Sequence, residues 1–161
     1  MMLSAGAGRV GNIPTTDYDR SVPDAAAAVI FDAEGRVLLM REAYERERYG
    51  LPGGVIEEGE SPRSAAIRET REELGLAVLA HELIAVYHLR TNRSDGLRFF
   101  FRCEIVGGGT PTVPPTGEVA SFVWARVDAL PEPLTTTAPY AVEDAAKGLR
   151  GIYREIDART V

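Results

Sequence analysis

Short blocks of apolar residues, many of them β-branched, recur along the chain and are separated by polar turns. The first two blocks, residues 22–31 and 37–40, flank an Asp-Ala-Glu-Gly turn and therefore predict a β-hairpin. The charged stretch 41–50 is predicted to be a loop. Later blocks predict three more strands, at residues 83–90, 97–106 and 119–127. A turn at 92–96 separates the first two of these strands, and a Gly/Pro-rich loop at 107–115 separates the last two.

Two helices are predicted among these strands. Ser61 suits the N-cap of the first, Pro62 its first turn and Gly75 its C-terminal stop. The second is expected over residues 138–156, where apolar residues follow helical spacing, with a break at one of the two glycines in that range. Strands mixed with two helices indicate an α+β fold in which a sheet is covered on both faces.

The composition is that of one ordinary domain. The chain has 161 residues, 45% of them hydrophobic, so it can bury a sizeable core. We interpret residues 1–20 as an N-terminal arm and 21–161 as a single domain. No apolar run approaches the ~18 residues of a membrane span. The lone Cys103 excludes an internal disulfide and suits a cytoplasmic location. The net charge of −6 disfavours a nucleic-acid partner.

One glycine motif is rejected. Gly6 to Gly11 has the glycine spacing of a dinucleotide-binding loop. Such a loop works only after a strand and at the start of a helix. Here the segment lies five residues from the N-terminus and is followed by Asn-Ile-Pro, so neither context exists.

The predicted first helix places three glutamates on one face, since Glu69, Glu72 and Glu73 fall at i, i+3 and i+4. Like charges at this spacing repel, and carboxylates in the last turn meet the negative end of the helix dipole. A solvated acidic face is the ordinary interpretation of such a run. The alternative is a divalent-cation site, because clustered carboxylate oxygens are what Mg²⁺ requires.

The longer segment around this helix favours the cation site. Its pattern, Gly54-x5-Glu60-x7-Arg68-Glu69-x2-Glu72-Glu73-x-Gly75-Leu76, resembles the Nudix box position by position. One position departs, because Thr70 stands where the family usually has an aliphatic residue. The order strand, box, strand, helix is also similar to the family's α/β/α sandwich with a mixed β-sheet between helices. We therefore take the resemblance to span residues 22–156.

The resemblance implies a metal-dependent hydrolase with Mg²⁺ or Mn²⁺ as cofactor. The metal ligands would be the three helix glutamates and, as in the family, the backbone carbonyl of Gly53. Arg68 resembles the family arginine that orients the neighbouring glutamate, and Glu60 would hold Arg68 by a charge-assisted bond. An ordinary surface ion pair is the alternative for these two residues.

The general base is less defined, because family members use either a box glutamate or one on a later loop. Glu69 is the first choice and Glu73 the second, and Glu143 in the second predicted helix is a weaker candidate. Glu118 starts a predicted strand after the Gly/Pro-rich loop. Its place is similar to that of a further metal-binding glutamate in some members, and a surface charge at a strand end is the alternative.

Substrate contacts are predicted from residue type. Arg90, Arg93 and Arg98 flank one predicted hairpin, and arginine suits phosphate through paired hydrogen bonds. Tyr49 could stack on a base. Solvated arginines and a core tyrosine are the alternatives. The proline and the tyrosine that mark the family's ADP-ribose and diadenosine-polyphosphate subclasses are absent downstream of the box.

These features predict an enzyme that cleaves the diphosphate linkage of a nucleoside diphosphate joined to another moiety, as in a nucleoside triphosphate or a nucleotide sugar. Its partner would be a small-molecule nucleotide, and no contact with a membrane is expected. A homodimer is one possible oligomeric state. Two alternatives are a nucleotide-sensing binding module and an RNA 5′-end pyrophosphohydrolase. The retained box glutamates weaken the first and the acidic charge weakens the second.

Overall fold

The computed structural model describes residues 23–44, 46–93 and 95–159. The predicted N-terminal arm, residues 1–20, and the rejected glycine motif within it lie outside this range. In chain order the elements are β1 (Ala25–Ile30), β2 (Val37–Glu42), β3 (Tyr49–Gly50), β4 (Gly53–Val55), α1 (Pro62–Leu74), β5 (Val78–Arg90), β6 (Asp95–Ile105), β7 (Val119–Ala125), α2 (Ala138–Ala146) and β8 (Ile152–Asp157).

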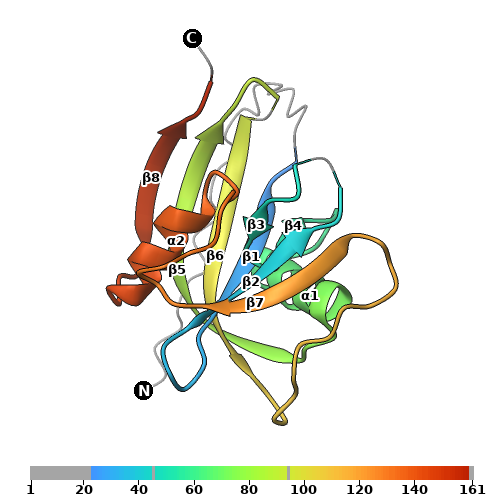
Figure 1. The fold of residues 1–161 in the computed structure, drawn as a ribbon. Coiled ribbons are helices and arrows are strands. Elements are labelled where there is room, and N and C mark those ends of the chain that lie inside the picture. The colour runs from blue at the N-terminus through green and yellow to red at the C-terminus, as the bar shows by residue number, and fades with distance from the viewer. Residues whose placement is uncertain (1–22, 45, 94, 160–161) are drawn as a thin grey trace, which may run out of the picture.

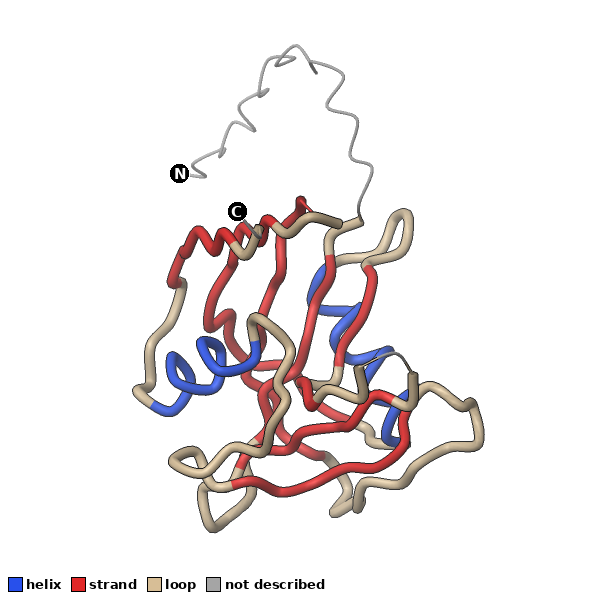
Figure 2. The backbone as a smooth tube through the Cα atoms, turned by 45° about the horizontal axis from the view of Figure 1, so that its top comes forward, coloured by secondary structure: helices blue, strands red, loops and turns tan. Residues whose placement is uncertain are grey.

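These strands form two sheets (Figure 1). The larger has the order β4-β1-β6-β5-β8 and is mixed, because β1 runs parallel to β6 and β5 parallel to β8, while the β4–β1 and β6–β5 pairs are antiparallel. The smaller has the order β3-β2-β7 and is antiparallel throughout. Figure 2 shows the smaller sheet lying across one end of the larger one.

The two helices cover opposite faces of the larger sheet. Along β1, Ala28 and Ile30 pack with Ala65, Ala66 and Leu74 of α1. Val29, which points to the other face, packs with Ala141 and Val142 of α2. This alternation is what a strand buried on both sides requires. The predicted α+β fold, with a mixed sheet between helices, is therefore confirmed.

The first helix begins and ends where its capping residues predict. The side chain of Ser61 accepts a hydrogen bond from the backbone N–H of Ser64 at 3.1 Å, which is the N-cap interaction. Gly75 ends the helix in the left-handed region, at φ 66°, and its N–H donates to Arg71. The carbonyl of Leu74, the last residue of α1, accepts a hydrogen bond from the N–H of Thr112 at 2.8 Å and so anchors the 107–118 loop to the end of the helix.

The predicted hairpin of residues 22–40 is wrong. A turn does join β1 to β2, with the Asp32 N–H donating to the Arg36 carbonyl at 2.9 Å, but the two strands enter different sheets. β1 pairs along its whole length with β6 and through Ala25–Ala27 with β4, and its contact with β2 is limited to an isolated antiparallel bridge between Phe31 and Val37. The predicted loop 41–50 also needs correction, because β2 continues to Glu42 and β3 pairs with its last residues.

The second predicted helix is correct only in its first half. α2 ends at Ala146, and residues 152–157 form the edge strand β8 instead. Gly148 and Gly151, at φ 69° and 61°, both take left-handed conformations that a continuous helix excludes. Beyond them Ile152, Arg154 and Ile156 alternate with more exposed residues, which is the spacing of a strand.

A buried carboxylate ties β8 to the helix before it. Asp144 of α2 is 1% exposed and accepts a hydrogen bond from the Tyr87 hydroxyl at 2.6 Å. The guanidinium of Arg154 in β8 donates to both oxygens of the same carboxylate, through Nε at 2.9 Å and through Nη2. The hydrogen bond from Arg154 is the main reason that the pKa of Asp144 lies below its ordinary value. β8 thus supplies the charge that lets Asp144 be buried.

Candidate active site

The short strand β4 and the helix α1 meet through two glycines and two glutamates. The backbone N–H of Gly53 donates to Oε2 of Glu73 at 2.8 Å. A Cβ atom on Gly54 would stand 2.5 Å from Oε1 of Glu69, so no larger residue fits beside that carboxylate in this arrangement. Gly54 therefore lets the Glu69 carboxylate come against the backbone of β4, whereas a Cβ atom on Gly53 would stand 2.3 Å from the Ala26 carbonyl of β1.

Arg68 connects most of the acidic residues of this region. Its guanidinium is bidentate to Glu60, with Nε–Oε1 at 2.9 Å and Nη2–Oε2 at 3.0 Å. Its Nη1 donates to Glu69 at 2.9 Å and to Glu72 at 3.1 Å. Arg68 is the first cause of the lowered pKa of Glu60. The structure therefore contains the Arg68–Glu60 pair that the sequence led us to expect, and the functional roles of both residues stay predictions.

The three glutamates of α1 have different environments. The side chain of Glu72 is 55% exposed. Glu73 is 7% exposed, and burial, followed by the charges of Glu69, Glu118 and Glu72, raises its pKa to about 9 against the hydrogen bond from Gly53. Burial also raises the pKa of Glu69, although Arg68 opposes that shift. Without a cation Glu73 is therefore protonated at neutral pH.

Glu118 lies close enough to act on this cluster, and Glu143 does not. The negative charge of Glu118 contributes to the raised pKa values of both Glu69 and Glu73. Its exposed position precedes β7, at the end of the loop that Thr112 anchors to α1. Glu143 belongs to α2, on the other face of the larger sheet, where it forms an ion pair with Lys147.

The chemistry of these donors fits a hard divalent cation. The carboxylates of α1 and Glu118, with the backbone of Gly53, offer the oxygen ligands that Mg²⁺ and Mn²⁺ bind. Among the described residues, 23–44, 46–93 and 95–159, no three His, Cys, Asp or Glu side chains are gathered tightly around one point. The guanidinium of Arg68 lies between Glu69 and Glu72 instead, so these side chains would have to turn toward an ion.

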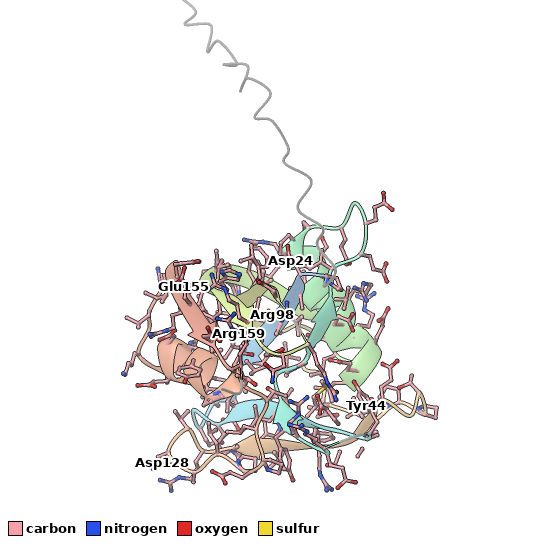
Figure 3. All side chains as sticks on the ribbon, turned by 90° about the horizontal axis from the view of Figure 1, so that it is seen from above. Asp24, Tyr44, Arg98, Asp128, Glu155 and Arg159 are labelled. Carbon is pink, nitrogen blue, oxygen red and sulfur yellow. The ribbon has the colours of Figure 1, made fainter. Side chains whose placement is uncertain are left out.

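A cavity of about 180 Å³ opens on the same strand β4. Ala25 to Ala27 of β1, Met40 of β2, Leu51 and the Phe99–Phe100 pair of β6 give it apolar walls, and Gly53 and Gly54 form its border with the glutamates. Four polar side chains also line it, namely Glu42, Arg98, Thr135 and Thr137. Figure 3 shows Arg98 close to Asp24, the residue just before β1. The cavity therefore lies between the two sheets, next to the carboxylate cluster.

Of the four residues predicted to contact the substrate, the cavity is lined by one, Arg98. Arg98 lines the cavity, where burial lowers the pKa of its guanidinium. Arg90 and Arg93 do not line it, because Arg90 lies beside the His88 ring at the end of β5 and Arg93 belongs to the turn that follows. Tyr49 is half-buried and packs against the cluster on the α2 side of the sheet.

Sequence reasoning missed the other polar residues of the cavity. Glu42 comes from the end of β2, within the stretch 41–50 that the sequence predicts to be a loop. Thr135 and Thr137 come from the segment before α2, which runs beside β3 because the backbone N–H of Thr135 donates to the Tyr49 carbonyl at 2.8 Å. No local pattern marks these positions, since strand pairing alone brings them together.

Comparison with known proteins agrees with this fold. The NUDIX domain family model matches residues 22–145. A MutT-like protein of Streptomyces ambofaciens is 31% identical over 135 residues, covering 84% of both chains. An 8-oxo-dGDP phosphatase of Danio rerio is 36% identical over 109 residues, which are 65% of this chain and 32% of that protein. The crystal structure of the MutT NUDIX hydrolase from Burkholderia pseudomallei superposes with a TM-score of 0.68 at 28% identity, covering 76% of this chain and 96% of that one.

The fold and these matches define a hydrolase of pyrophosphate bonds. The chain belongs to the Nudix hydrolase family, as the box from Gly54 to Leu76 led us to expect. In the described part of the chain no helix is both long enough and apolar enough to cross a membrane.

Proposed function

We propose that this protein is a Mg²⁺- or Mn²⁺-dependent hydrolase of nucleoside di- or triphosphates. The observation that carries the proposal is the shared strand β4. Gly54 borders the cavity on one side and contacts the carboxylate of Glu69 on the other. A nucleotide whose base enters the cavity would therefore present its phosphates to the carboxylate cluster.

The roles of the residues follow from their positions. A bound divalent cation supplies charge neutralisation for the phosphate oxygens and activation of water. Glu69, Glu72, Glu73 and Glu118, with the Gly53 carbonyl, would hold it. Arg68, fixed by the two hydrogen bonds to Glu60, orients the Glu69 carboxylate. Glu69 is our first choice for the general base, because its carboxylate lies at the border of the cavity.

The substrate class rests on two kinds of support. The relatives named as an 8-oxo-dGDP phosphatase and a putative 8-oxo-dGTP diphosphatase point to nucleotides with a chain of phosphates. The cavity has the volume of a small ring system, well below the ~300–1,000 Å³ of clefts that enclose a drug-sized ligand. It can take one base, while a second moiety beyond the phosphates would remain outside. A nucleotide sugar is thus the second candidate.

A substrate panel tests the proposal. Nucleoside triphosphates, nucleoside diphosphates, a nucleotide sugar and a 5′-triphosphorylated RNA oligonucleotide are each incubated with Mg²⁺, and released phosphate and pyrophosphate are measured. We expect turnover of nucleoside tri- or diphosphates that stops in excess EDTA and returns with Mg²⁺ or Mn²⁺. Glu69→Gln serves as the inactive control.

Two results would contradict the proposal. Turnover that persists in excess EDTA, and equally in Glu69→Gln, would remove the metal mechanism. Binding of nucleotides without turnover of any of them would favour the sensing module instead.

A further inference from the structure

Glu42 is a carboxylate in an otherwise mostly apolar cavity. Its side chain is 15% exposed and lines the cavity at the end of β2. The pairing of β2 with β7 shifts register between Arg41 and Glu42. Such an irregularity changes the direction of the side chains beside it. The active-site chemistry proposed above does not use this residue.

The ion pair with Arg48 does not account for Glu42 fully. The Arg48 Nε atom lies 3.3 Å from Glu42 Oε2, longer than the ~2.7–2.9 Å of a strong charge-assisted hydrogen bond. A carboxylate accepts several hydrogen bonds, and a shielded one requires them. Glu42 therefore keeps acceptor capacity beyond this ion pair, and it borders the cavity.

The polar groups of the cavity select among the bases. Glu42 offers two acceptor oxygens, and the guanidinium of Arg98 offers donors. Guanine alone among the common bases carries two adjacent N–H donors, at N1 and N2, together with acceptors at O6 and N7. Adenine and cytosine present a single amino donor beside an acceptor nitrogen, which a carboxylate repels. Uracil and thymine flank their one N–H with two carbonyl oxygens.

We propose that Glu42 is the specificity-determining residue of the cavity and selects guanine-type bases by accepting hydrogen bonds from N1–H and the 2-amino group. Met40, Leu51 and Phe99 provide the apolar contacts for the ring. The inference rests on the proposed function, because it places the base of the hydrolysed nucleotide in this cavity.

Base analogues test the proposal without any mutation. ITP is GTP without the 2-amino group, so the ratio of kcat/KM for GTP to that for ITP isolates one hydrogen bond. We expect the wild-type protein to favour GTP over ITP by about 10- to 100-fold, the range for a hydrogen bond to a charged group. We also expect GTP to exceed ATP, CTP and UTP.

Three variants then assign the selectivity. Glu42→Gln should bring the GTP to ITP ratio close to one, mainly by lowering kcat/KM for GTP. Glu47→Gln is the matched control, because Glu47 lies in the same β2–β3 connection, is exposed, pairs with Arg41 and does not line the cavity. Arg48→Gln removes the partner of Glu42 and should preserve the ratio, which separates base selection from a structural role of the ion pair.

The outcomes remain distinct from those of the proposed function. Equal rates for GTP and ITP in the wild-type protein, or a GTP to ITP ratio that Glu42→Gln leaves unchanged, would overturn the role of Glu42 even if triphosphates are hydrolysed. An equal loss of the ratio in Arg48→Gln would assign the effect to the ion pair and overturn it as well. Failure to hydrolyse any nucleotide would instead contradict the proposed function itself.

Discussion

The backbone N–H of Gly53 donates to the carboxylate of Glu73 across 2.8 Å, although 20 positions separate the two residues. This bond joins β4, which borders the cavity, to the last turn of α1. It holds a carboxylate that burial keeps protonated at neutral pH in the metal-free protein. In the function proposed above, a cation bound by Glu73 would replace this proton.

Glu73→Gln should reduce activity without loss of metal-free stability. Removal of a metal ligand or base costs transition-state stabilisation, so we expect kcat to fall at least ~100-fold. Glutamine keeps the acceptor for the Gly53 N–H and is neutral, as the protonated carboxyl is, so the melting temperature in EDTA should not fall. Enzyme assays and thermal unfolding check both, with the exposed Glu58→Gln as control. Near-wild-type activity would remove Glu73 from the site.

The stability of the metal-free protein should depend on pH through Glu73. The folded state keeps this proton up to about pH 9, whereas the unfolded chain releases it near the ordinary value of 4.5. Between these values the folded state binds more protons, so the free energy of unfolding should fall as pH rises. In EDTA the melting temperature of the wild type should decline across this window more steeply than that of Glu73→Gln.

Magnesium should reverse this trend. Because the cation binds the deprotonated carboxylate, its affinity should increase with pH, and the Mg²⁺-induced rise in melting temperature should increase as well. Thermal unfolding at several pH values, with and without saturating Mg²⁺, measures this Mg²⁺-induced rise. If the Mg²⁺-induced rise in melting temperature is the same at every pH, Glu73 does not bind the cation.

Glu60→Gln should lower kcat by about tenfold or more, in the ~10–100-fold range for residues that orient metal ligands. The charged partner that fixes Arg68 in two hydrogen bonds is lost, and Arg68 no longer holds Glu69 in place. Glu57→Gln is the matched control, because Glu57 is exposed and its oxygen stays 3.8 Å from Arg68. Equal kinetics of the two variants would assign Glu60 to an ordinary surface pair.

Arg98→Ala should raise KM for the nucleotide and change kcat little, because Arg98 lines the cavity and lies away from the reacting phosphate. Arg90→Ala and Arg93→Ala should behave as the wild type, since neither residue lines that cavity. Steady-state kinetics of the three variants tests the distinction. If KM rises in Arg90→Ala and in neither of the other two variants, the base of the nucleotide does not bind in this cavity.

Arg154→Gln should destabilise the protein by several degrees in melting temperature while the kinetics stay unchanged. The change leaves the buried Asp144 carboxylate with only the Tyr87 hydroxyl as a side-chain partner. Tyr87→Phe, which keeps the ion pair, should cost less. Arg126→Gln is the control, because it breaks an exposed pair with Asp128. Equal effects of Arg154→Gln and Arg126→Gln would mean that the buried charge is not compensated by Arg154.

The sequence predicted those parts of the molecule whose signals are local. Ser61, Pro62 and Gly75 mark the ends of α1 by their own backbone preferences, and the helical spacing of Glu69, Glu72 and Glu73 follows from the helix alone. The failures at the predicted 22–40 hairpin and in the second half of the last predicted helix involve pairing between distant segments. β1 meets β6 and β4 rather than β2, and β8 lies against β5, which precedes it by more than 60 residues.

The cavity could not be predicted for the same reason. Glu42, Arg98 and Thr135 come from three elements, and each of them resembles an ordinary surface or loop residue in its own segment. Burial also gives Glu73 a different character from Glu72, although the two are adjacent in the chain. Helical spacing shows that they share a region of the helix, but tertiary packing decides which of them loses contact with water.

The position of Arg154 has a practical consequence for anyone who shortens or fuses this protein. The family match ends at residue 145, yet the guanidinium that neutralises Asp144 belongs to residue 154. A fragment cut at the end of the match would retain the Nudix box and the cavity, but it would expose the outer edge of β5 and leave an ionised carboxylate against Tyr87. Fusion partners and affinity tags should therefore be attached beyond Asp157.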